Sequence, residues 1–335
     1  MSSSASLRPQ HAAALPAGAG FVCAALGIAL AAAALAGWAP VRFSVVTVFL
    51  FAGPHNWLEL RYFLTRMPAR WGRLRGYFVT AFAGIFALTA TYAALPWLAR
   101  RFDWAEDAWL GSAAQWNTAL VLWVLALVQM RSRQNPRRDW FWTFPVAFIL
   151  IALAWVDPLV WGMGVVYAHP LVAFWVLDRE LRRSRPAWRP AYHACLCCVP
   201  VLLGLLWWRL ADAPPLPGTD RLSAAITNQA GAGILTGVST HLLVSTHTFL
   251  EMLHYGIWVV AIPLVALRWD LRAVPLARRS PGWRKVVLGL LGVGVVVVLL
   301  LWGCFLANYP VTRDVYFTVA MLHVLSEVPF LLRAL

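Results

Sequence analysis

Apolar runs of about twenty residues alternate with short polar connections along the whole chain. A helix of that length crosses a hydrocarbon core of about 30 Å, because each residue adds about 1.5 Å. The pattern predicts an all-α fold, a polytopic integral membrane helical bundle of about ten transmembrane helices. The expected spans are 17–39, 43–64, 77–98, 113–130, 141–156, 159–177, 191–210, 240–267, 287–306 and 313–332.

No soluble domain interrupts these runs, so a single transmembrane domain is expected over residues 1–335. The fifth run reaches the sixth through only Asp157 and Pro158, which predicts a tight hairpin. Residues 1–16 are expected to form a short cytoplasmic tail, and the run after them is too long for a typical signal peptide, which predicts a retained anchor. Residues 211–239 are rich in Pro and Gly, which disfavour a continuous helix and predict an external loop able to re-enter the bundle.

Basic side chains gather in every second connection of this chain, whose formal net charge is +14. They are Arg66, Arg70, Arg73 and Arg75; Arg131, Arg133, Arg137 and Arg138; Arg179, Arg182, Arg183, Arg185 and Arg189; and Arg268, Arg272, Arg278, Arg279, Arg284 and Lys285. By the positive-inside rule these four loops are cytoplasmic, which predicts an N-in/C-in topology in a bacterial-type inner (plasma) membrane. Topology and contact with the lipid bilayer account for the charges, so no nucleic-acid partner is expected.

Three histidines are each followed four residues later by a glutamate inside an apolar run: His55/Glu59, His247/Glu251 and His323/Glu327. The chain has only eight His and five Glu, so three such pairs are far more than chance would give. Positions i and i+4 of a helix share a face, so each pair presents an imidazole and a carboxylate in one direction. Ionisable groups inside a membrane are costly unless they meet a partner or a polar cavity, which makes these pairs candidates for a functional site.

The predicted topology brings these groups to one depth. His55, His254 and His323 lie about twelve, fourteen and ten residues into their spans, near the bilayer midplane. In the eighth span, offsets of four and three keep His247, Glu251 and His254 on one stripe, and Glu-x-x-His is the element that di-iron carboxylate bundles use. We predict metal ligands at His55, His247, His254, His323, Glu251 and Glu327, with the last two also as catalytic candidates. This donor set suits non-haem iron, and zinc or manganese less well.

Other polar residues are expected around the ligands rather than among them. Glu59 lies deeper in the membrane and has Arg61 or Arg66 as alternative partners. His169 precedes a proline in the sixth span, and His241 is expected at the outer mouth of the site. Glu59, His169 and His241 are therefore predicted to be neighbours of the metal ligands rather than ligands themselves. His193 is expected near the cytoplasmic boundary, away from the metal site.

Three short stretches resemble a known family. Gly53-Pro-His55-Asn-Trp-Leu-Glu59 resembles the Gly-x-Pro-His-Gly-Ala-Leu-Asp-His motif of the bacteriorhodopsin-related-protein (Brp/Blh) family, membrane dioxygenases that cleave β-carotene to retinal. The helix that ends in His254, and Ala320-Met-Leu-His323-Val-Leu, are similar to that family's other His-bearing segments. Leu60 and Leu322 depart from the family's His and Pro, and Trp57 stands in place of Ala. The resemblance implies an iron site at His55, His254 and His323, while the carotenoid substrate does not follow from it.

These observations favour a membrane-embedded non-haem iron oxygenase or related oxidoreductase that acts on a lipophilic, carotenoid- or isoprenoid-like substrate entering from the lipid. An ion- or proton-coupled transporter is an alternative, because midplane His and Glu can also bind cations or relay protons. A bis-His haem electron carrier using His247 and His254 is a further alternative, although carboxylates at the same level argue against it. A purely structural assembly factor is the fourth.

Overall fold

The computed structural model describes residues 18–134, 139–218, 220–266 and 270–334. Its α-helices are α1 (Ala19–Trp38), α2 (Pro40–Arg66), α3 (Arg75–Arg101), α4 (Glu106–Gln134), α5 (Thr143–Val156), α6 (Pro158–Ser184), α7 (Arg189–Leu196), α8 (Cys198–Leu210), α9 (Arg221–Gln229), α10 (Thr240–Gly256), α11 (Ile262–Val265), α12 (Pro281–Ala307) and α13 (Tyr309–Ala334). A π-helical turn, Ile257–Ala261, joins α10 to α11. Single 3₁₀ turns are Gly72–Leu74, Pro186–Trp188, Leu271–Ala273 and Leu276–Arg278.

The expected all-helical bundle is confirmed over the described residues, which contain no strand. Eight of its helical segments are long and apolar enough to cross a membrane. The helices at two of the expected spans do not belong to those eight. One is α2, which carries charged groups inside its apolar sequence, and the other is α5, which has only 14 residues. The expected tail at 1–16, and Arg137, Arg138 and Arg268, lie outside the described residues.

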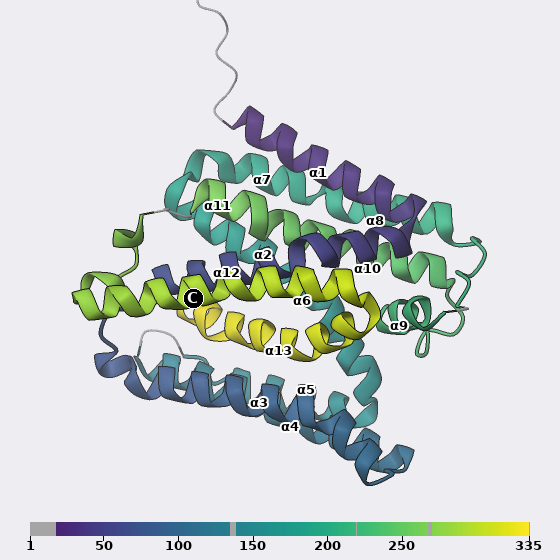
Figure 1. Cartoon of the computed structure of the whole chain (residues 1–335), viewed down its shortest axis with the longest axis horizontal. Coiled ribbons are helices and arrows are strands. Elements are labelled where there is room, and N and C mark those ends of the chain that lie inside the picture. The colour runs from purple at the N-terminus through teal and green to yellow at the C-terminus, as the bar shows by residue number, and fades with distance from the viewer. Residues whose placement is uncertain (1–17, 135–138, 219, 267–269, 335) are drawn as a thin grey trace, which may run out of the picture.

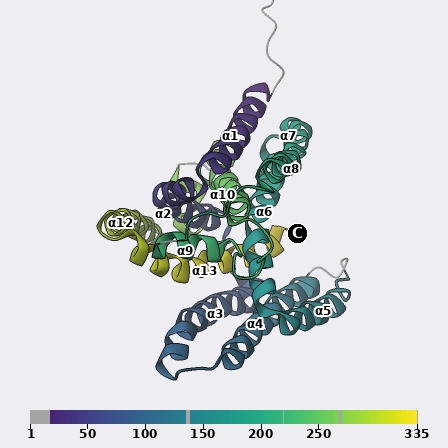
Figure 2. The same ribbon diagram turned by 90° about the vertical axis from the view of Figure 1, so that its right-hand side faces the viewer.

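The helices form two unequal groups, one of which surrounds α10 (Figures 1 and 2). In one group α3, α4 and α5 lie side by side, and α13 packs against α3. In the other group α1, α2, α6 and α8 surround α10. Twelve of the 17 residues of α10 are buried, whereas only three of the 27 residues of α12 are, so α10 forms the core and α12 presents its apolar side chains outward. Outward-facing apolar surface is what a lipid environment requires.

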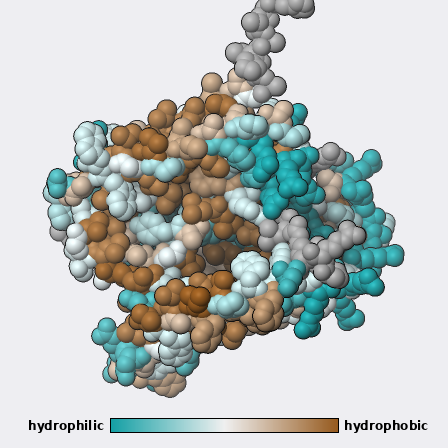
Figure 3. Space-filling view, turned by 180° about the vertical axis from the view of Figure 1, so that it is seen from behind, coloured by the Kyte–Doolittle hydropathy of each residue, from teal (hydrophilic) through white to brown (hydrophobic). Residues whose placement is uncertain are grey.

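All four Arg-rich connections lie at one end of the bundle. The α2–α3 and α6–α7 connections, the last turn of α4 and the approach to α12 are on the left in Figure 1, together with the start of α1 and the C-terminus. The space-filling view from behind shows apolar residues across the middle of the molecule and hydrophilic residues gathered at that same end (Figure 3). The helix α9 and the α12–α13 turn lie at the opposite end. We refer to the Arg-rich end as the basic end.

The segment 211–239, expected as a loop, contains the short helix α9. Asp220 caps this helix, because its carboxylate accepts hydrogen bonds from the backbone N–H and the hydroxyl of Ser223 at 2.9 and 2.6 Å. The helix packs against α10 and α2 and places Gln229 over the interior of the bundle. The Pro- and Gly-rich sequence therefore breaks the chain around a short helix that covers one end of the candidate site.

Candidate metal centre

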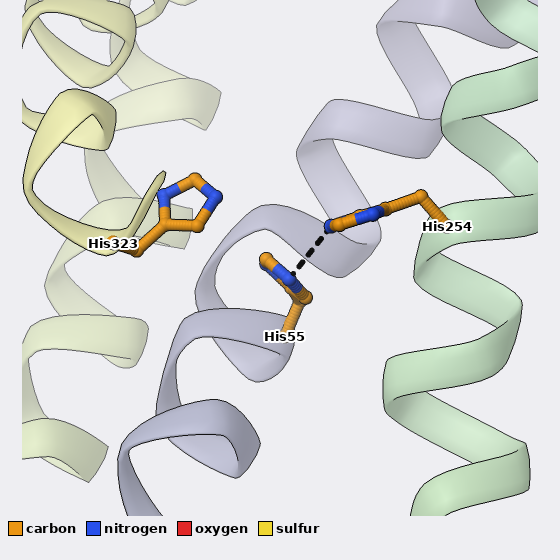
Figure 4. A group of neighbouring side chains, drawn as sticks. All are labelled: His55, His254 and His323. Atoms are coloured by element: carbon orange, nitrogen blue, oxygen red, sulfur yellow. Dashed lines mark hydrogen bonds between the residues drawn. The ribbon is translucent and has the colours of Figure 1, made fainter. Parts of the chain in front are cut away.

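Four histidines from four helices converge in the bundle: His55 of α2, His169 of α6, His254 of α10 and His323 of α13. Their ring centroids are 4.6 Å apart for His169–His254, 4.8 Å for His55–His254, 5.0 Å for His55–His323 and 5.3 Å for His169–His323. We call this group the imidazole cluster. Figure 4 shows His55, His254 and His323 turned toward a common space.

The ring nitrogens of the cluster lie at distances that suit shared coordination. Nε2 of His254 is 3.1 Å from Nε2 of His55, the contact drawn as a dashed line in Figure 4. One donor atom from each of His55, His254 and His323 lies within 4.8 Å of the others. Ligands about 2.1 Å from one ion are separated by roughly 3 to 4 Å, so small adjustments would bring these nitrogens to one centre.

Two carboxylates border the imidazole cluster. Oε2 of Glu327 is 3.2 Å from Nδ1 of His169, and Oε2 of Glu59 is 3.8 Å from Nε2 of His55. These two glutamate side chains are 2% and 1% exposed, and three of their four oxygens have no hydrogen-bond partner. Burying a carboxylate without a compensating charge is strongly unfavourable. One divalent cation would neutralise both carboxylates, and the donor set therefore fits a metal ion.

Local sequence disturbs the helices beside three of the four imidazoles. Pro54 precedes His55 inside α2, and Pro170 follows His169 inside α6. A proline inside a helix removes one backbone hydrogen bond and bends the helix, which lets the adjoining side chain leave the regular helical surface. His254 lies three residues before the π-helical turn Ile257–Ala261, a feature that is often found at functional sites.

The surroundings of the cluster are aromatic. The ring of Tyr255 is 5.1 Å from that of His55, and the fully buried Trp258 is 6.0 Å from it. These side chains enclose the imidazoles from the side of α10, so the cluster lies in a low-dielectric environment. Electrostatic interactions are stronger in such an environment than in water.

The stripe predicted on α10 faces one cavity. His247, Glu251 and His254 line a space of about 320 Å³, which His169 and His323 also border. Only His254 is in contact with the other imidazoles of the cluster. The ring of His247 instead contacts Tyr167, with centroids 5.8 Å apart, and seven residues along a helix correspond to about 10 Å. His247 and Glu251 thus occupy the part of the cavity toward α9, where the side chain of Arg313 donates a hydrogen bond to Gln229.

The other histidines considered from the sequence lie at very different distances from the imidazole cluster. His169, expected only around the site, is a member of the imidazole cluster. His241 is in the first turn of α10, about 20 Å along that helix from His254, too far to touch the ligands. His193 is half exposed, and its Nε2 is 2.7 Å from Asp178.

Glu59 and Arg66, considered as partners from the sequence, are not paired with each other. Arg66 forms an ion pair with Glu180, while Glu59 is directed toward the imidazole cluster. The sequence places Glu59 one helical turn nearer the cytoplasmic surface than His55. In the structure His55 and Glu59 are both almost completely buried on one face of α2.

Sequence analysis could have found His169 by the argument that identified its partners. It lies about ten residues into the expected span 159–177, which is again the midplane. It was ranked lower because it has no glutamate four residues away. Its carboxylate partner, Glu327, comes from α13, and only tertiary packing reveals that pair.

A large apolar groove reaches the cluster from the side. It has a volume of about 630 Å³ and runs between α2, α12 and α13, with Glu59 and His323 in its wall. Most of the remaining wall is aliphatic and comes from α12 and α13. Trp57 spans the groove toward α12, where its indole N–H donates to the carbonyl of Leu291 at 3.0 Å. We call this space the lateral groove.

Comparisons with protein-family models, with curated proteins and with solved structures found no match to this chain.

Proposed function

We propose that the protein is a membrane-embedded, non-haem iron oxygenase or related oxidoreductase that acts on a lipophilic substrate. The observation that supports this most strongly is the direct connection between a metal-suited cluster and an apolar groove. His323 belongs to the imidazole cluster, Glu59 borders it, and both side chains line the lateral groove. An apolar molecule in the groove would therefore lie against the ligands.

The imidazole cluster and its two carboxylates are the residues that would hold the ion. Nitrogen and carboxylate donors suit iron, with zinc or manganese as less favoured occupants. When bound, iron would supply the redox chemistry that activates dioxygen toward an apolar substrate. Glu327 lies beside Nδ1 of His169 and is placed to keep a proton on that nitrogen. The unprotonated Nε2 of His169 would then be the atom that binds the metal. Glu251 lines the cavity toward α9, which His169, His254 and His323 also border, and it is placed to exchange protons with water in that cavity.

The lateral groove supports a substrate drawn from the bilayer. Its wall is aliphatic apart from a few polar groups near the cluster, so an isoprenoid-like chain would bury apolar surface along it. The walls would also exclude water from the reacting centre. A carotenoid-like substrate agrees with the resemblance to the Brp/Blh family, and Trp57, which narrows the groove beside α12, favours a slimmer or differently placed substrate.

For the topology we propose about ten membrane crossings, with both termini on the cytoplasmic side of a bacterial-type inner membrane. The gathering of the four Arg-rich connections at the basic end supports this assignment. A helix occupies each of the ten expected spans. In α2 the charged and imidazole groups would face the bundle interior, where the cluster provides partners for them.

A divalent-cation transporter is the second candidate. Cavities lie on both sides of the cluster. One of about 320 Å³ toward α9 is lined by its imidazoles, and one of about 370 Å³ at the basic end has Glu327 in its wall. In this function the metal would be cargo rather than a cofactor. A haem carrier is less well supported, because the ring of His254 is packed between two imidazoles at 4.6 and 4.8 Å, which leaves no width for a porphyrin.

Metal content and the visible spectrum of the detergent-purified protein test the proposal. Stoichiometric iron without a Soret band supports the oxygenase. A Soret band would support the haem carrier, and metal uptake into proteoliposomes would support the transporter. Absence of any bound metal after expression with added iron, zinc or manganese would refute the metal centre.

A further inference from the structure

A polar cavity at the basic end is distinct from the lateral groove. It has a volume of about 370 Å³ and lies between α2, α6 and α13. Five arginines line it: Arg66 from α2, Arg179, Arg182 and Arg183 from α6, and Arg333 from α13. Only two carboxylates, Glu180 and Glu327, share the wall, so positive charge is in excess.

One of these carboxylates is already neutralised. Glu180 is almost completely buried, accepts a 2.7 Å hydrogen bond from the hydroxyl of Tyr62 and forms an ion pair with Arg66. Arg333 in turn donates to the backbone carbonyl of Arg66. These contacts fix two guanidinium groups in the wall, which reduces the entropy lost when a ligand orders them.

The remaining arginines are positioned around the opening. Arg179 lies over the ring of Trp175, with its guanidinium carbon 4.9 Å from the ring centre. Arg183 is 60% exposed and 3.8 Å from Glu180, too exposed for a strong ion pair. Loop arginines that only set topology would be expected to point individually toward water or headgroups. Here the guanidinium groups of three separate helices border one space.

We propose that this cavity binds an anionic, phosphate-type group. A planar guanidinium group binds two oxygens of a phosphate through paired, charge-assisted hydrogen bonds, and several arginines around one cavity provide more donors than Glu180 consumes. The group belongs either to the headgroup of an anionic lipid or to a soluble phosphate compound. The inference concerns anion affinity alone and does not depend on a bound metal or on the proposed oxygenase activity.

The position of the cavity suggests a consequence for the metal centre. Glu327 lines the cavity and also approaches His169 in the cluster. A bound anion would therefore lie on one side of Glu327, at the basic end, and the imidazole cluster would lie on the other side. The headgroup of a substrate or of a regulatory lipid would be held at the membrane surface while the cluster lies at hydrocarbon depth.

The test uses the full-length protein in phosphatidylcholine nanodiscs at fixed ionic strength. Pyrophosphate binding is measured by calorimetry, and retention of added phosphatidylglycerol is measured by native mass spectrometry. Binding of pyrophosphate identifies a site for soluble phosphates, and selective retention of phosphatidylglycerol identifies a site for lipid headgroups. The double variant Arg179→Gln/Arg182→Gln should weaken the observed binding about tenfold or more, because it removes charge-assisted donors.

The matched control is Arg73→Gln/Arg75→Gln. It removes the same charge from the same end of the molecule, at exposed residues outside the cavity, and should change binding less than about twofold. Equal weakening in both double variants would show a general effect of basic surface and would overturn the proposal. Failure of both probes to bind the unaltered protein would do the same.

A variant of opposite expected sign gives an independent check. Glu180→Gln retains an oxygen that can accept hydrogen bonds from Tyr62 or Arg66, but it removes one negative charge from the cavity wall, so phosphate binding should become tighter. Weaker binding in a Glu180→Gln protein that elutes as the unaltered protein does would contradict the assignment. If this variant fails to fold, the comparison of the two arginine pairs decides the question.

Discussion

His254 is expected to be the histidine whose loss reduces metal retention most. It contributes to both candidate groups of three ligands, one with His55 and His323 and the other with His169 and Glu327. The remaining residues of the cluster occur in only one group each. Replacing His254 with alanine therefore disrupts either arrangement that an ion could adopt, whereas the loss of His169 or His55 leaves one arrangement intact.

The size of the effect follows from the burial of the site. Residues that merely support metal ligands contribute about 10- to 100-fold in affinity, so the loss of a direct ligand should exceed roughly 100-fold, or about 2.7 kcal/mol. The side chain of His254 is 3% exposed, so water cannot easily replace it as a ligand. We expect His254→Ala to lose its metal during chelator dialysis that leaves the unaltered protein loaded. His323→Ala, which keeps the group of His169, His254 and Glu327, should also lose metal, but more slowly than His254→Ala.

The assay is the metal-to-protein ratio of detergent-purified protein, with gel filtration as a check on folding. His247→Ala is the matched control, because His247 lies on the same helix and cavity but does not touch the other imidazoles. His193→Ala is the surface control and should retain metal, since His193 is half exposed and paired with Asp178. Equal metal content in the His254, His323 and His193 variants would refute the assignment of the cluster.

Reporter fusions should place both termini and the four Arg-rich connections in the cytoplasm, and an external C-terminus would overturn the proposed topology. Gly84→Ala should lower the thermal unfolding midpoint, because the new Cβ would lie 1.9 Å from the indole of Trp123 and such overpacking costs about 1–3 kcal/mol. An unchanged midpoint would show that the α3–α4 contact is looser than described. If the substrate is a carotenoid, expression in a carotenoid-accumulating bacterium should bleach the cells and His55→Ala should reduce the bleaching, while unchanged pigment with a fully metal-loaded protein would exclude the carotenoid. Trp57→Ala should widen the lateral groove and accelerate turnover of bulkier substrates relative to slim ones, as measured by product ratios, because its indole contacts α12 across the groove at Gly294.

The sequence predicted the helices well because lipid imposes a simple rule on them. A span must be apolar for about twenty residues, and the pattern of runs therefore located a helix at each expected span. The rule does not predict where a helix breaks or changes its geometry within a span. The seventh span is divided at Cys197 into α7 and α8, and the eighth continues through a π-helical turn, and neither break has a hydropathy signal.

The sequence also identified most of the residues of the site, but not which of them come together in the fold. The i, i+4 offset selected His55, His323 and Glu327, and the i, i+3 offset from Glu251 selected His254, because such positions share a helix face whatever the tertiary structure is. The same rule gave His247 equal weight, although it lies about two helical turns from the cluster. It undervalued His169, whose carboxylate partner is on another helix.

What the sequence determined by itself is therefore local and one-dimensional. It determined which segments are helical and apolar, which connections are basic, and which helix faces carry donors, because these properties depend on neighbouring residues and on the solvent. Packing decided which faces meet. A four-imidazole cluster formed where the middle parts of α2, α6 and α13 meet the end of α10, and the spacing of α2, α12 and α13 left an apolar groove beside it. The cluster arises from contacts between residues that are 85 positions apart for His169 and His254 and 268 positions apart for His55 and His323, and no local pattern encodes such contacts.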